Sequence, residues 1–136
     1  MLQIFFLSIA ANLIAGAALA SDAISRRIKG FIALADILSS RRAKLILGPS
    51  VLIIGFLALF VPADAGPLIL GDLIPSAVGM AMGIAILFEV FKQDSLLPAE
   101  SSEKQERQVF AYRTTLGFLG MIVAVLHFFL GERFLL

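Results

Sequence analysis

The sequence predicts an all-α integral membrane protein with four transmembrane helices and a basic amphipathic interfacial helix between the first and second of them. Of its 136 residues, 60% are hydrophobic and 15% are charged, whereas a soluble domain has about 45–50% and about 25%. The mean hydropathy is +0.98. Apolar residues gather in four long segments, and basic residues gather in alternate connections. This composition argues against a soluble enzyme, a disordered chain and a nucleic-acid-binding module.

Each of the four apolar segments has the length that a helix needs to cross a membrane, about 20 residues with a range of about 17–25. The predicted spans are residues 4–20, 45–61, 73–91 and 114–130. With their connections they form one domain, residues 1–136. Ala18-Leu19-Ala20 is typical of a signal-peptide cleavage site, but the basic residues follow this segment instead of preceding it. We therefore expect an uncleaved helix.

The positions of lysine and arginine predict the orientation, because cytoplasmic loops carry an excess of them. Between the first and second spans lie Arg26, Arg27, Lys29, Arg41, Arg42 and Lys44. Around a polar loop at about 92–107 lie Lys92, Lys104, Arg107 and Arg113. The connection 62–72 has no basic residue, and the C-terminal end has only Arg133. We expect two cytoplasmic loops, both termini outside, and residence in a bacterial inner membrane.

The connection between the first two spans has the pattern of an amphipathic helix over about 22–40. Its apolar residues at helical spacing are Ile24, Ile28, Phe31, Ile32, Ala35 and Leu38, with basic residues between them. Such a helix prefers to lie in the membrane interface. Arg26, Arg27, Lys29, Arg41, Arg42 and Lys44 are then candidates for binding anionic lipid headgroups. The same segment could instead be a soluble extension of a neighbouring span.

Polar side chains inside a bilayer are costly, so each one is a candidate functional residue. Asn12, midway along the first span, could line a polar path or bind across a helix seam. Glu89 could form an ion pair with Lys92 at the interface, since the two are three residues apart on a helix; it could also be a buried proton or cation site. His127 could respond to pH or could be a neutral imidazole bonded within the bundle.

Small residues predict where the helices approach one another closely. The residues expected at these seams are Ser8, Gly16, Gly79, Gly83 and Gly120. Gly79 and Gly83 have GxxxG spacing, which serves a homodimer contact as well as a neighbouring helix of the same chain.

The sequence favours a function without catalysis. The chain has no cysteine and one histidine, and its residues form no set typical of an enzyme, a metal site or a cofactor site. We therefore expect a non-catalytic subunit or scaffold of a larger membrane complex. It would contact membrane lipids and either copies of itself or other membrane subunits, but no nucleic acid. The alternatives are an oligomeric channel or transporter for small ions or solutes, lined by Asn12, Glu89 and His127, and a lipid-interacting protein.

Overall fold

A computed structural model describes residues 2–60, 73–94 and 102–130, which form helices and short links, with no strand among them. The elements in chain order are α1 (Leu2–Leu19), α2 (Ser21–Arg27), the short 3₁₀ helix η1 (Lys29–Phe31), α3 (Ile32–Ser39), α4 (Arg41–Phe60), α5 (Leu73–Asp94) and α6 (Ser102–Leu130). The described part of the chain is therefore all-α, as predicted.

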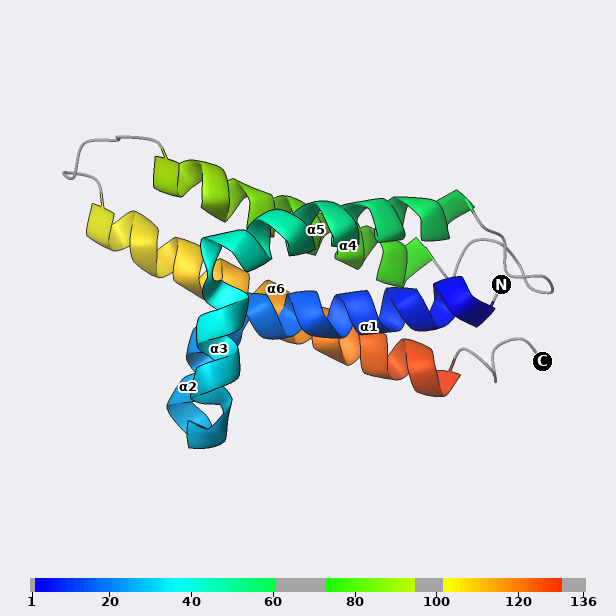
Figure 1. Cartoon of the computed structure of the whole chain (residues 1–136), viewed down its shortest axis with the longest axis horizontal. Coiled ribbons are helices and arrows are strands. Elements are labelled where there is room, and N and C mark those ends of the chain that lie inside the picture. The colour runs from blue at the N-terminus through cyan, green and yellow to red at the C-terminus, as the bar shows by residue number, and fades with distance from the viewer. Residues whose placement is uncertain (1, 61–72, 95–101, 131–136) are drawn as a thin grey trace.

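The four long helices form two antiparallel pairs, α1 with α6 and α4 with α5 (Figure 1). Helix α1 also packs against α4 and α5, so the two pairs make one bundle. The beginning of α1 and the end of α6 lie at the same end of this bundle (Figure 1). Helices α2 and α3 leave its flank near the end of α1 and the beginning of α4 (Figure 1).

Within the described ranges, three stretches are long and apolar enough to cross a membrane: Arg41–Phe60, Leu73–Lys92 and Ala111–Phe129. Gln3–Leu19 and Ser21–Arg27 meet the same criterion as a pair that is bent by 73°. The structure thus has three candidate spans, or four if the bent pair is one span. Large apolar side chains cover their outer surfaces; Ile46 is 70% exposed and Phe129 is 66% exposed. Such exposed apolar surfaces suit contact with lipid tails better than contact with water, which is what a helical membrane protein requires.

Three helices extend further than the hydropathy predicts. Helix α4 begins at Arg41, and the Ser40 hydroxyl accepts a hydrogen bond from the Ala43 amide at 3.3 Å, which caps the helix. Helix α5 continues to Asp94 and α6 begins at Ser102, so much of the polar loop predicted at 92–107 is helical. A helix satisfies its own backbone groups, so it can continue beyond the apolar segment. The predicted connection 62–72 lies outside the described residues.

The segment 22–40 is not the single helix that its periodicity predicts. Helix α2 ends at Arg27; the next residue, Ile28, is extended (φ −121°, ψ 99°), and Gly30 follows within η1. Glycine is a poor helix former. The chain reverses here, and α3 packs against α2 (Figure 1). We call residues 21–39 the α2–α3 hairpin.

Glycines allow the paired helices to approach closely. A Cβ added at Gly16 would lie 2.6 Å from the Gly117 carbonyl oxygen, and one added at Gly117 would lie 2.6 Å from the Gly16 oxygen. Between α4 and α5, a Cβ added at Gly83 would lie 2.9 Å from the Gly48 oxygen. Gly120 packs against the Met82 side chain. The GxxxG pair therefore contacts helices of the same chain, because Gly83 faces α4 and Gly79 faces α1.

Candidate functional site

Four charged side chains from four helices meet where α1 ends and α4 begins. They are Asp22 of α2, Lys44 of α4, Glu89 of α5 and Arg113 of α6, and we call them the charge cluster. Each lies near the end of an apolar segment of the sequence. The antiparallel packing of the helices brings these four ends to one level.

Glu89 is the centre of the charge cluster. Its Oε2 atom lies 2.9 Å from Lys44 Nζ, and its Oε1 atom lies 2.8 Å from Arg113 Nε. Arg113 also donates a hydrogen bond from Nη1 to Asp22 Oδ2 at 3.2 Å. The side chains of Lys44, Glu89 and Arg113 are 7%, 13% and 17% exposed, whereas that of Asp22 is 47% exposed.

The charge cluster balances two cations with two carboxylates. An ion removed from water is costly unless it is paired and hydrogen-bonded. Glu89 pairs with two largely buried cations, Lys44 and Arg113. Removing its charge would leave both cations without their nearest counter-ion. The Asp22 pair is more exposed and should contribute less. The arrangement therefore supports a structural role, in which charge joins α2, α4, α5 and α6.

The structure separates Lys44 from the other five basic residues considered for headgroup binding. Lys44 is buried against Glu89, whereas Arg26, Arg27, Lys29, Arg41 and Arg42 are exposed. Glu89 pairs with Lys44 and Arg113 of other helices, and its pairing with Lys92 stays a prediction. Sequence reasoning treated Arg113 as a topology marker and did not consider Asp22. One feature of the sequence could have identified the charge cluster: all four residues lie at ends of apolar segments, on the same predicted side of the membrane.

Asn12 joins α1 to α5. Its side chain is 2% exposed, and Nδ2 donates a hydrogen bond to the Pro75 carbonyl at 3.0 Å. Gly79, one turn further along α5, leaves room for the amide, because an added Cβ would lie 2.6 Å from Asn12 Oδ1. Ser8, one turn before Asn12, is also buried. This geometry supports the seam interpretation of Asn12.

Substitutions at this seam should be coupled. We expect Asn12→Ala to lower the free energy of unfolding by about 1 kcal/mol, since a hydrogen bond inside a membrane protein contributes about 0.6 and at most about 1.7 kcal/mol. Gly79→Ala should cost about 1–3 kcal/mol, because the methyl group displaces the Asn12 amide. In the double variant the methyl group occupies the space that Asn12 leaves, so the combined loss should be smaller than the sum. Denaturation of the purified variants in detergent measures this; strictly additive losses would contradict the contact.

The structure does not bring Asn12, Glu89 and His127 together. Glu89 is 14 residues beyond Pro75 on α5, which places it about 21 Å from the level of Asn12 at about 1.5 Å per residue. Buried apolar side chains lie between these levels: Ala15, Leu19, Val51, Met82 and Ile86. His127 is half-buried, near the beginning of α1, where its ring centroid lies 4.7 Å from that of Phe5.

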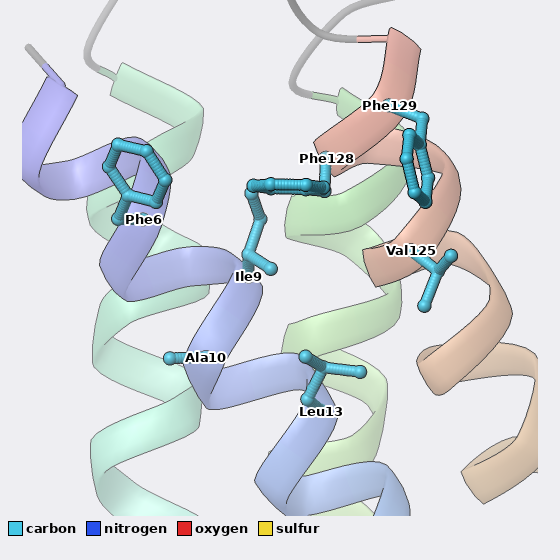
Figure 2. Close-up of a pocket in the computed structure, with 7 residues that line it drawn as sticks. All are labelled: Phe6, Ile9, Ala10, Leu13, Val125, Phe128 and Phe129. Carbon is cyan, nitrogen blue, oxygen red and sulfur yellow. The ribbon is translucent and has the colours of Figure 1, made fainter.

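An apolar groove lies between α1 and α6, near the beginning of α1 and the end of α6. Its volume is about 470 Å³, and it is lined by Phe6, Ile9, Ala10, Leu13, Val125, Phe128 and Phe129. Figure 2 shows these side chains projecting from the two helices, with Ala10 as the smallest of them. The groove has no charged residue in its lining, so it suits an apolar occupant.

The described residues contain no group of three or more histidines, cysteines or carboxylates that could hold a metal ion. Comparison with known proteins adds one match, to a family model that covers residues 1–127 and describes no activity. No curated protein and no solved structure matches the chain.

Proposed function

The chain belongs to the family whose model covers residues 1–127, and we propose that it is a non-catalytic subunit or scaffold of a larger membrane complex. The observation that carries this proposal is how its intramembrane polar groups are used. Asn12 binds the backbone of α5, and Glu89 binds Lys44 and Arg113. An apolar core separates the two sites. These groups serve the bundle's own assembly, which supports a structural role over the alternative of a channel or transporter.

The proposed topology has four spans, with α1 as the first and α4, α5 and the second half of α6 as the others. Both termini are extracytoplasmic, the α2–α3 hairpin lies in the cytoplasmic interface, and the membrane is a bacterial inner membrane. The basic residues around residues 26–44 and 92–113 support this orientation. The length of α1 supports its role as a span, since its 18 residues extend about 27 Å, against a hydrocarbon core of about 30 Å.

The groove between α1 and α6 is where we place the contact with another subunit. Its occupant would be a transmembrane helix, because small residues such as Ala10 allow helices to approach closely in a membrane. Phenylalanine side chains on both walls offer large apolar contact areas. From Phe6 to Leu13 the groove follows α1 for about 10 Å, or about two turns.

Co-purification from native membranes tests this proposal. Ala10→Trp should fill the groove and reduce recovery of the partner subunit roughly tenfold, which corresponds to about 1.4 kcal/mol of binding free energy. Leu7→Trp is the matched control, because Leu7 is 52% exposed on the same helix and does not line the groove. Native mass spectrometry then identifies the complex and its stoichiometry.

Three outcomes would contradict the subunit role. One is a single homogeneous chain with no partner, and another is a complex made only of copies of this chain. The third is a flux of ions or small solutes through the chain reconstituted alone, which would favour the transporter. Equal partner recovery with Ala10→Trp and Leu7→Trp would remove the groove as the contact.

A further inference from the structure

The α2–α3 hairpin exposes more apolar surface than a water-exposed hairpin would tolerate. Four of its large apolar side chains are 47–64% exposed: Ile28, Ile32, Leu34 and Ile37. They lie close together in a short segment of 19 residues, and a large exposed apolar patch usually marks contact with a membrane or a protein. The hairpin therefore needs an apolar environment on part of its surface.

Exposed cations lie at the tip of the hairpin and just beyond its base. Arg27 and Lys29 flank the turn, and Arg42 stands at the beginning of α4, where the hairpin rejoins the bundle. All three are exposed, and they form no ion pair with any residue that the structure describes. Lys44 and Arg113 differ in this respect, since both are largely buried and paired with carboxylates of the chain. The three exposed cations are thus available to an external anion.

The bundle places the hairpin at the height where apolar and anionic groups meet. Helix α1 extends about 27 Å, so its end reaches the edge of the hydrocarbon core if it crosses the membrane. The chain then bends by 73° into α2, which directs the hairpin sideways from the bundle (Figure 1). Arg113 of α6 holds the base of the hairpin through Asp22.

We infer that the α2–α3 hairpin binds anionic phospholipids of the leaflet in which it lies. Its apolar side chains enter the boundary between headgroups and acyl chains, and Arg27, Lys29 and Arg42 bind the phosphates. A basic residue near an anionic membrane surface strengthens binding by roughly fivefold. This inference rests on α1 crossing the membrane, which belongs to the proposed topology, and does not depend on a partner subunit.

Tryptophan fluorescence tests this inference cleanly, because the chain has no tryptophan of its own. The reporter is Ile37→Trp in the full chain, reconstituted in phosphatidylcholine vesicles that contain a minor fraction of phosphatidylglycerol. Bromine on the acyl chains of one lipid or the other quenches nearby tryptophan. We expect brominated phosphatidylglycerol to quench this tryptophan several-fold more than its share of the lipid predicts. Ile53→Trp, on the exposed surface of α4, is the control and should show no such preference.

The cations are then removed from the Ile37→Trp reporter by a triple substitution: Arg27→Gln, Lys29→Gln and Arg42→Gln. This variant should lose the preference for phosphatidylglycerol, while brominated phosphatidylcholine still quenches its tryptophan. Adding Arg27→Lys and Arg42→Lys keeps the charge and should retain the preference. Equal quenching of the Ile37→Trp reporter by both lipids, or no quenching of it, would overturn the inference; the second result would point to a protein as the hairpin's partner. A second control, Ile14→Trp on the exposed surface of α1, reports separately whether α1 is in the membrane, so failure of lipid binding by the hairpin is distinguishable from failure of the proposed topology.

Discussion

Replacing Glu89 with glutamine is expected to lower the free energy of unfolding by about 3–5 kcal/mol, which is typical when one partner of a buried ion pair is removed. Glutamine has nearly the same shape, so the change removes a charge and little packing. Lys44 and Arg113 would then stand together in a largely buried site, with Asp22 as the remaining carboxylate of the charge cluster. Thermal unfolding in detergent should show a Tm lower by roughly 10 °C.

The matched control for Glu89→Gln is Asp36→Asn, which makes the same charge change on an exposed side chain of α3. It should shift the free energy of unfolding by less than about 0.5 kcal/mol. The double variant Lys44→Met/Glu89→Gln should be more stable than Glu89→Gln alone. It leaves one cation, Arg113, beside one carboxylate, Asp22. If Glu89→Gln unfolds at the same temperature as Asp36→Asn, the charge cluster does not stabilise the bundle.

Gly117→Ala is expected to separate α1 from α6. The new methyl group would lie 2.6 Å from the Gly16 carbonyl oxygen and 2.9 Å from the Ala20 nitrogen. Both are main-chain atoms, so the helices must move apart, because no side chain can rotate away. Overpacking of a core typically costs about 1–3 kcal/mol, and we expect the upper end of that range or more. Gly16→Ala should behave in the same way, since it meets the Gly117 oxygen at 2.6 Å.

Gly30→Ala makes the identical chemical change where there is room for it. No atom lies within 4 Å of the added Cβ, and no described glycine has a positive φ. This variant should be as stable as the original chain or more stable by up to about 1 kcal/mol, because alanine restricts the unfolded chain. Thermal unfolding of the three variants in one detergent compares them directly. Equal Tm values for Gly117→Ala and Gly30→Ala would contradict the close crossing of α1 and α6.

The candidate residues show how far sequence reasoning reaches at this site. A polar group in an apolar segment is visible in the sequence, and so Asn12 and Glu89 were identified. Their partners were not, because Pro75 is 63 residues from Asn12, and its backbone carbonyl gives no signal in the sequence. Arg113 looked like one of several loop cations. Its distinction from Arg27 or Arg42 is burial beside Glu89, which depends on how α5 and α6 pack.

The helix seams and the hairpin were also predictable only in part, because their contacts depend on how the helices pack. Gly16 and Gly83 were recognised as small residues on helix faces, but their counterparts Gly117 and Gly48 were not, since two faces must be aligned before a contact can be named. The spacing of apolar residues at 22–40 fits one long helix and two short helices, each with its own apolar face, equally well. The reversal of the chain at Ile28 and Gly30 depends on the packing of α3 against α2.

Composition and hydropathy were sufficient to predict a helical membrane protein with long apolar helices at these places in the chain. The physical reason is that transfer from water to lipid is a local and nearly additive property of each segment. Only the tertiary structure decided that Lys44 belongs with Glu89, that Asn12 binds α5, and that the segment after α1 is a hairpin. These outcomes depend on which helix ends reach the same level and which faces meet, and residues far apart in the sequence determine both together.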